Sequence, residues 1–355
     1  MGRSTTTSRT VFDPDAAAAP GSGVFGLPYS FDDAGVIVVP VPFEATTSYG
    51  GGTIDGPRAL REASHQVDLY DAELGRVYGL GIHMLDEPAD VRQWNDEARE
   101  MAAHILAAGG LGSDLRLVAA SKLVNQRGEQ VNEWVKGTVD RCIGVGKLAC
   151  VVGGDHSVAF GAIDALAARY PGLGVLQLDA HADLRRAYGG FTWSHASIMY
   201  NVCELLPNVG KLVQVGIRDV GEAELEYIRS SGGRIKTHFD EALAEQRFAG
   251  ESWLRQVSRI VDDLPQRVYL SFDIDGLEPT LCPHTGTPVP GGLTFQMAIS
   301  LIKAVVRSGR QIIGMDLCEV APGPAGDQWD GNVGARLLYK MIGWALRSLG
   351  MLQPL

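Results

Sequence analysis

Short apolar segments alternate with longer amphipathic segments along most of the chain. The apolar segments are rich in β-branched residues and end in Gly, Asp or Pro, which is typical of buried strands. They span Val36–Pro42, Leu148–Gly154, Gly174–Asp179, Lys211–Arg218, Arg234–Phe239, Arg267–Asp275 and Gln311–Val320.

Segments with apolar residues at helical spacing lie between the predicted strands. They span Ala98–Ala108, Leu117–Ile143, Val158–Tyr170, Ala196–Leu206, Glu222–Ser230, Trp253–Leu264, Phe295–Ser308 and Val333–Leu349. Strand and helix in alternation predict right-handed crossovers, and therefore a mostly parallel sheet with helices on both faces.

A single domain is predicted over residues 31–355, because this stretch shows no internal repeat and no change of composition. Residues 1–30 differ from it: they are rich in Ser, Thr, Ala, Gly and Pro and show no periodicity. We therefore expect an extended N-terminal arm.

The charge balance narrows the classes of ligand. The 355 residues include 31 Lys and Arg against 42 Asp and Glu, so the net charge is −11 with His neutral. A nucleic-acid partner is not expected, because binding to phosphates requires clustered basic residues. No apolar run reaches the roughly 18 residues of a membrane span, so no membrane partner is expected either. If the acidic side chains converge on one site, the ligand there should be a cation.

The cysteines indicate a reducing compartment. There are five, an odd number, and none stands in a Cys-x-x-Cys pair. This pattern favours a cytoplasmic protein over one held together by disulfide bonds.

Asp and His residues stand at the ends of three predicted strands, where open parallel sheets bind their ligands. They are His156, Asp179, His181, Asp183, Asp273 and Asp275. A helix cap, a buried polar network or a turn cluster would explain each motif singly. Together, four carboxylates and two imidazoles without a thiolate predict two divalent ions such as Mn²⁺, with Ni²⁺, Fe²⁺ or Co²⁺ as alternatives. Two such ions activate a shared water as a nucleophile.

Four motifs in order resemble the signature segments of the ureohydrolase family, which includes arginase and agmatinase. They are GGDHS at 153–157, DAHAD at 179–183, SFDIDGLEP at 271–279 and GMDLCEVAP at 314–322, and the resemblance covers about residues 35–350. It implies a three-layer α/β/α fold of the arginase type and a binuclear manganese-type centre. It also implies a homo-oligomer, as a trimer or hexamer.

The resemblance assigns a role to each matching residue. One metal would be held by His156, Asp179, Asp183 and Asp273, and the other by Asp179, His181, Asp273 and Asp275, with Asp179 and Asp273 bridging. A metal-activated water would attack the guanidinium carbon and release urea and an amine, with Asp183 as a proton acceptor.

Two further residues match positions that act on the substrate. Glu319 would bind the guanidinium nitrogens, and His195, in WSHAS, would shuttle a proton to the leaving amine. On their own, Glu319 would be interpreted as a solvated loop glutamate and His195 as a histidine at a helix start.

The segment between Asp183 and His195 departs from the family pattern. It reads LRRAYGGFTWS and lacks the loop with which arginases grip an amino acid's carboxylate, so arginine is not the expected substrate. The agmatinase form of this segment is also absent. Arg185 and Arg186 at the predicted mouth would oppose a second cationic centre, which weakens agmatine.

The loop VPFEATTSYGGGT at 41–53 and the N-terminal extension resemble the branch that hydrolyses free guanidine or small substituted guanidines, often with nickel. Phe43, Thr46 and Thr47 would form the floor of a small pocket and Trp193 its wall. Ordinary turn chemistry explains the threonines equally well.

The expected function is therefore hydrolysis of a small cationic guanidino compound. The alternatives within this reaction are agmatinase, guanidinobutyrase and arginase activity. A different class of function is a non-catalytic subunit that supports a catalytic paralogue in a mixed oligomer. That interpretation is disfavoured because all six ligand positions are present. A third alternative, formimino-group hydrolysis or deacetylation, keeps the metals, but Glu319 disfavours deacetylation.

Overall fold

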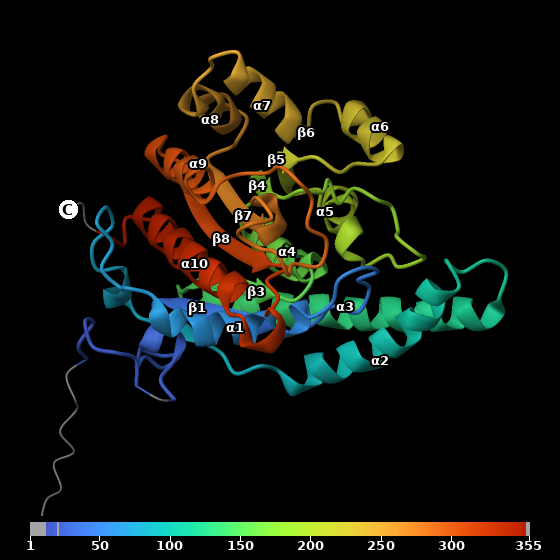
Figure 1. Ribbon diagram of the computed structural model, residues 1–355, viewed down its shortest axis with the longest axis horizontal. Coiled ribbons are helices and arrows are strands. Elements are labelled where there is room, and N and C mark those ends of the chain that lie inside the picture. Colours follow the sequence, from blue (N-terminus) through green and yellow to red (C-terminus); the bar gives the residue numbers. More distant parts are fainter. Residues whose placement is uncertain (1–11, 20, 353–355) are drawn as a thin grey trace, which may run out of the picture.

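The computed structural model describes residues 12–19 and 21–352, and its centre is one parallel sheet (Figure 1). The strands are β1 (Val36–Val41), β2 (Ile82–Met84), β3 (Leu148–Gly153), β4 (Leu173–Leu178), β5 (Val209–Ile217), β6 (Ile235–Phe239), β7 (Arg267–Asp273) and β8 (Gln311–Cys318). Their order in the sheet is β2-β1-β3-β8-β7-β4-β5-β6, and every neighbouring pair is parallel.

Helices cover both faces of this sheet (Figure 1). One face carries α1 (Gly56–Ala63), α7 (Asp240–Phe248), α8 (Trp253–Asp262), α9 (Phe295–Arg307) and α10 (Trp329–Ser348). The other carries α2 (Ala89–Ala107), α3 (Leu115–Gly144), α4 (Phe160–Arg169), α5 (Ile198–Leu205) and α6 (Glu222–Ser230). The predicted three-layer α/β/α fold is confirmed.

The strands form because both of their faces are buried. In β3, Cys150 and Val152 pack into the core on the α10 side, whereas Ala149 and Val151 pack into the core on the α3 side. A strand covered on both faces needs apolar side chains at every position. This explains why the strands appear in the sequence as continuous apolar runs.

Some elements carry too weak a pattern for prediction from sequence. β2 has three residues, and the short helix α1 contains Pro57 in its first turn. The first half of α2 is largely polar, so its apolar spacing becomes visible only from Ala98 onward. α7 lies between β6 and α8 and buries Leu243, its one buried apolar side chain.

The predicted arm, residues 1–30, falls outside the described residues at 1–11 and at 20. Of its described part, Val24, Phe25 and Leu27 are buried in the core on the α10 side. The Phe25 backbone N–H donates to Ser64 Oγ at 2.8 Å, and the Phe25 ring lies 5.0 Å from that of Tyr339. This end of the arm is therefore part of the packed domain.

None of the described helices combines the length and the hydropathy that crossing a membrane requires. All five cysteines are free and buried, at Cys142, Cys150, Cys203, Cys282 and Cys318.

Candidate metal centre and active site

Four neighbouring strands in the middle of the sheet carry the candidate site at their carboxyl ends. The order β3-β8-β7-β4 sets these ends side by side. The segments at or after them carry, in the same order, His156, Glu319, the pair Asp273 and Asp275, and the segment 179–183. This edge of an open parallel sheet is where ligands bind.

Two glycines allow these strand ends to approach one another. A Cβ atom at Gly154 would come within 2.2 Å of the Phe43 carbonyl oxygen, and one at Gly276 within 2.7 Å of the Asp179 backbone nitrogen. Only glycine fits such contacts. The motifs GGDHS and DIDG therefore need these glycines for the close packing of the strand ends.

A first group of ligand atoms surrounds His156. Its Nδ1 lies 3.0 Å from Asp179 Oδ2, 3.0 Å from Asp183 Oδ2 and 3.6 Å from Asp273 Oδ2. All four side chains are buried. The structure thus brings together the four residues that the sequence assigns to one ion.

A second group lies around His181. Its Nδ1 is 3.1 Å from Asp275 Oδ2 and 3.6 Å from Asp179 Oδ1. Ligand atoms of His156, Asp179 and Asp183 all lie within 4.8 Å of one another, as do those of Asp179, His181 and Asp275, so Asp179 belongs to both sets. Asp273, 3.6 Å from His156 Nδ1, lies outside both sets. Because its two oxygens face different histidines, Asp179 is placed to bridge two ions.

The shifted pKa values of this cluster indicate that it would bind cations. Burial and the charge of Asp179 raise the pKa of Asp183 to about 8. Burial and the charges of Asp275, Asp179 and Glu319 raise the pKa of Asp273 well above its usual range. Although burial alone would lower it, Asp275 and Asp179 raise the pKa of His181 to about 12. Negative charge is in excess here, and a pair of divalent ions would relieve it.

The tautomer of His156 also fits a metal ligand. Its Nε2 lies 2.9 Å from Ser271 Oγ, and that hydroxyl donates to Asp316 Oδ1 at 3.2 Å. Since the hydroxyl proton is used on Asp316, Ser271 accepts from Nε2–H of the histidine. The lone pair of His156 is then on Nδ1, facing the carboxylates, as a ligating imidazole requires.

A buried chain of amides fixes Asp179. Gln177 Nε2 donates to Asp179 Oδ2 at 2.7 Å, and Gln214 Nε2 donates to Gln177 Oε1 at 2.7 Å. The chain ends at Thr237, whose hydroxyl donates to Gln214 Oε1 at 2.7 Å. It crosses β4, β5 and β6. Satisfied networks of this kind orient a ligand before the metal binds.

Glu319 lies beside the cluster in a strained backbone conformation, with φ of 63°. Its N–H donates to the Gly154 carbonyl at 2.8 Å, and its Oε1 accepts from the His156 backbone N–H at 3.0 Å. Oε2 is buried and has no hydrogen-bond partner among the described residues. Burial and the charges of Asp155 and Asp275 raise the pKa of Glu319 well above its usual range. Asp183, with φ of 55°, also adopts a left-handed backbone conformation. Strained backbone conformations of this kind are common at functional sites.

A cavity of about 150 Å³ opens onto the cluster, and His195 lines it. His195 Nδ1 lies 3.4 Å from Thr46 Oγ1, and its ring lies 6.1 Å from that of Tyr188. Burial, the largest cause, and the nearby His181 lower the pKa of His195 to about 4. Its imidazole is therefore neutral at neutral pH. The full lining is Ser48, His181, Asp183, Arg185, Tyr188, His195, Ala196, Asp219, Glu224 and Thr287.

Residues 34–343 match the family model described as "Arginase family". The chain belongs to the arginase family. Members of this family are binuclear metal hydrolases, and the two His and Asp groups fit a pair of ions. The chain is thus an enzyme, a hydrolase of guanidino or amidino compounds.

Named relatives agree with this membership. The chain is 31% identical to an N(1)-aminopropylagmatine ureohydrolase of Synechocystis over 89% of its length and 90% of that protein. It is 28% identical to an agmatinase of Bacillus anthracis, over 82% of this chain and 86% of that one. A solved structure, the proclavaminate amidino hydrolase of Streptomyces clavuligerus, shares the fold with a TM-score of 0.71 and 22% identity, over 94% and 99% of the two chains.

In this arginase-family chain, part of the predicted pocket lies elsewhere. Trp193 does not line the cavity with His195. Its ring packs against that of Phe160, with centroids 4.9 Å apart, and its Cβ faces Gly128 on α3. Thr47 donates to the Glu44 carbonyl and accepts from Arg99. Ring packing therefore accounts for the position of Trp193, and local hydrogen bonds account for that of Thr47. Thr46, in contrast, does reach His195. Phe43 is also buried in the core on the α3 side.

At the mouth of the cavity the structure places Arg185, as predicted, together with Glu224 and Asp219, which the sequence did not assign. Arg185 Nε lies 3.6 Å from Glu224 Oε2, and its guanidinium carbon lies 5.1 Å from the Tyr188 ring centre. Asp219 is exposed on the same cavity. Glu224 follows β5 by several residues, and only the fold brings it to the mouth. Gln177 and Gln214, in contrast, stand out as polar residues within apolar strands and offered a sequence signal.

Proposed function

We propose that the chain hydrolyses a small guanidino compound, either free guanidine or a substituted guanidine, to urea and ammonia or an amine. The observation that carries this proposal is the unpartnered Oε2 of Glu319, a buried carboxylate oxygen beside six metal-type ligands. A planar guanidinium supplies the N–H donors and the positive charge that this oxygen lacks.

The six ligand positions would hold two divalent ions, Mn²⁺ by family resemblance, or Ni²⁺ as in the branch that acts on small guanidines. When bound, the ions lower the pKa of a water molecule and polarise the substrate. The donor set of four carboxylates and two imidazoles suits both metals. No cysteine belongs to either described His and Asp group, which argues against a thiolate zinc site.

Three side chains have separate roles in the hydrolysis. Glu319 binds and orients the guanidinium, and Asp183 accepts a proton from the attacking water. The neutral imidazole of His195, positioned by Thr46 at 3.4 Å, relays a proton to the nitrogen that leaves. One water is consumed, one carbon–nitrogen bond breaks, and urea and a protonated amine or ammonium are released.

The size of the cavity supports a small substrate. About 150 Å³ is less than the roughly 300 Å³ at which pockets for drug-sized ligands begin. Arg185 at the mouth is paired with Glu224, so its charge does not exclude a second cationic group. The cavity volume therefore carries the preference for a small substrate over arginine.

A second candidate, agmatine or a longer aminoalkyl guanidine, is favoured by Asp219. This exposed carboxylate lines the mouth and takes part in no ion pair among the described residues, so it can receive a distal ammonium group. The names of the relatives from Synechocystis and B. anthracis point in the same direction.

The assembly and domain organisation are proposals as well. By resemblance to the family, the chain forms a homo-oligomer, a trimer or hexamer. A mixed oligomer with a paralogue is the alternative. Residues 31–355 form one catalytic domain, and Val24, Phe25 and Leu27 from the predicted arm pack into its core. The protein works in the reducing cytoplasm.

The experiment is a urea-release assay on protein loaded with Mn²⁺ and, separately, with Ni²⁺. The substrates are guanidine, methylguanidine, agmatine, guanidinobutyrate and arginine. We expect the highest kcat/KM with guanidine or methylguanidine. Glu319→Gln should abolish turnover, whereas Glu241→Gln, an exposed matched control on α7, should not change it. Higher kcat/KM with agmatine would favour the second candidate, and no turnover of any compound by metal-loaded protein would contradict the proposal.

A further inference from the structure

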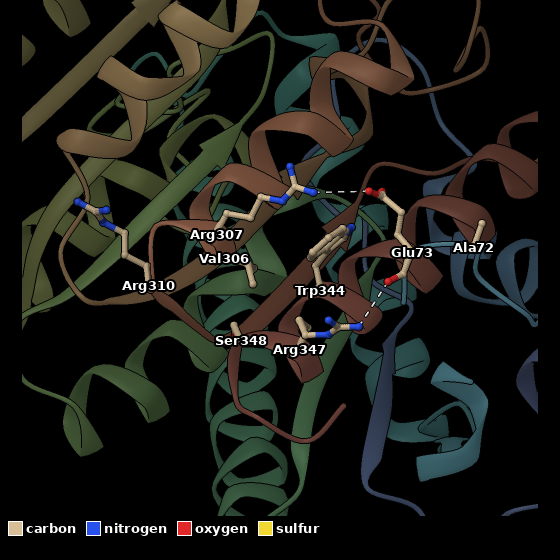
Figure 2. Close-up of a pocket in the computed structure, with 9 residues that line it drawn as sticks. Ala72, Glu73, Val306, Arg307, Arg310, Trp344, Arg347 and Ser348 are labelled. Atoms are coloured by element: carbon tan, nitrogen blue, oxygen red, sulfur yellow. Dashed lines mark hydrogen bonds and ion pairs between the residues drawn. The ribbon is translucent and has the colours of Figure 1, made fainter. Parts of the chain in front are cut away.

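A group of basic side chains surrounds a cavity at the end of the sheet opposite the metal ligands. The cavity has a volume of about 590 Å³ and is lined by residues at the ends of α9 and α10 and by Ala72 and Glu73 (Figure 2). α9 ends at Arg307, and Arg310 directly precedes the first residue of β8. The cavity therefore lies where β8 begins, whereas Glu319 lies where it ends.

The charges around this cavity are strongly unbalanced. Three arginines, Arg307, Arg310 and Arg347, line it together with Glu73, which is the one carboxylate among the described lining residues. Lys303, on α9, pairs with Glu73, whereas the Arg310 side chain points away from Glu73 (Figure 2). Among the lining residues the excess is two positive charges, in a chain whose net charge is −11.

Glu73 only partly satisfies its basic neighbours. Lys303 forms an ion pair with its carboxylate, and Arg307 Nη2 lies 3.7 Å from Oε1. Arg347 reaches only the Glu73 backbone carbonyl, at 3.4 Å, and its Nε is buried without a hydrogen-bond partner among the described residues. Figure 2 shows Arg307 and Arg347 approaching Glu73 from either side of Trp344.

Helix capping explains part of this arrangement but not all of it. Arg307 and Arg347 stand in the last turns of α9 and α10, where cations complement the helix dipole. Arg310 lies beyond the end of α9 and is held by the Leu264 carbonyl and Ser308 Oγ. Because helix C-termini themselves disfavour an anion, any affinity for one must come from these side chains.

We propose that this basic cavity is a binding site for a small molecule that carries two or more carboxylate or phosphate groups. Guanidinium groups bind such oxyanions through paired N–H donors, which a single glutamate cannot saturate. The volume is in the range of small-molecule sites, and Trp344 and Val306 supply an apolar surface for the body of the ligand. Glu73 acts as an internal competitor that an entering anion displaces.

The test measures binding of citrate and of inorganic pyrophosphate to the full-length protein by calorimetry, at constant ionic strength. The double variant Arg307→Gln/Arg347→Gln should raise the Kd about ten-fold or more, because two charge-assisted contacts are lost. The matched control Arg116→Gln/Arg229→Gln removes the same charge from two exposed arginines on other helices and should bind like the wild type. Chelation of active-site metal by either probe would appear equally in all three proteins.

A third variant tests the role of Glu73. Glu73→Gln removes the competitor and should lower the Kd several-fold, whereas a cluster that serves only to pair Glu73 would gain nothing. Preference between citrate and pyrophosphate distinguishes a carboxylate from a phosphate ligand. The proposal is overturned if the wild type binds neither probe or if all variants bind equally. It is also overturned if the double variant changes only the oligomeric state on light scattering, which would make this surface an interface between copies.

Discussion

The sites at the two ends of β8 differ in charge, in burial and in how firmly their side chains are held. At its carboxyl end, four carboxylates converge with two histidines, and nearly all of these side chains are buried. At its amino end, three arginines line a more open cavity, and the Arg307 side chain is 66% exposed. The acidic end is held by backbone and side-chain hydrogen bonds from several strands, whereas the basic end relies on long side chains and one partly exposed glutamate.

This difference indicates two kinds of binding. Metal ions need ligands fixed to within a few tenths of an ångström, so the acidic end places its carboxylates on short side chains at strand ends. Oxyanions can be bound by long, flexible arginine side chains. The basic end can therefore draw its side chains from the surfaces of helices. The predictions below follow this contrast, beginning at the acidic end.

The largest effect is expected from Asp179→Ala. Asp179 belongs to both ligand groups, so its loss should weaken the binding of both ions at once. Urea release should fall to background in protein incubated with Mn²⁺ or Ni²⁺. Asp263→Ala, which removes a half-exposed carboxylate that pairs with His238, is the control and should retain activity. Substantial activity in the Asp179 variant would mean that this residue does not bridge the ions.

His195→Ala should lower kcat by about 10²–10⁴-fold, the usual contribution of a general acid or base. Metal content should stay at the wild-type value, because His195 lies in the cavity and not in either ligand group. Steady-state kinetics and metal analysis on the same sample separate the two effects. His104→Ala, an exposed histidine on α2, is the matched control. An unchanged kcat would remove His195 from the mechanism.

Ser271→Ala should weaken metal binding by about 10–100-fold, the range for residues that orient a ligand histidine. Without the hydroxyl, the tautomer of His156 that presents its Nδ1 lone pair is no longer favoured. A titration against a competing chelator measures the change. Ser230→Ala on the surface of α6 should leave affinity unchanged, and equal affinities in both variants would show that Ser271 has no orienting role.

The basic end should have the smallest effect on the chemistry. Arg307→Gln/Arg347→Gln should leave urea release within about two-fold and stability within about 1 kcal/mol, since surface substitutions rarely exceed ±0.5 kcal/mol each. Chemical denaturation and the urea assay provide the measurements. A large loss of activity at saturating metal would show that the two ends are coupled and not independent.

The acidic end could be predicted from sequence because its ligands are local to strand ends. Asp179, His181 and Asp183 alternate directly after an apolar run, so their convergence follows from strand geometry. The fold could also be predicted from the sequence, because strands buried on both faces must be apolar throughout.

The basic end and the mouth were not predictable in the same way. Lys303 and Arg347 come from different helices, and Glu73 comes from a loop 230 positions before Lys303. Only packing places them together. Trp193, proposed from the sequence as a pocket wall, packs its ring against that of Phe160 and is not among the residues that line the cavity with His195.

We propose that the acidic end holds two metal ions. The most direct test of this proposal is the metal-to-chain ratio, measured by inductively coupled plasma mass spectrometry after loading with Mn²⁺ or Ni²⁺ and removal of free metal. The wild type should hold two ions per chain, and His181→Ala and Asp275→Ala should each hold fewer, while His238→Ala still holds two. A ratio of one or less in the wild type, or of two in both ligand variants, would contradict the account.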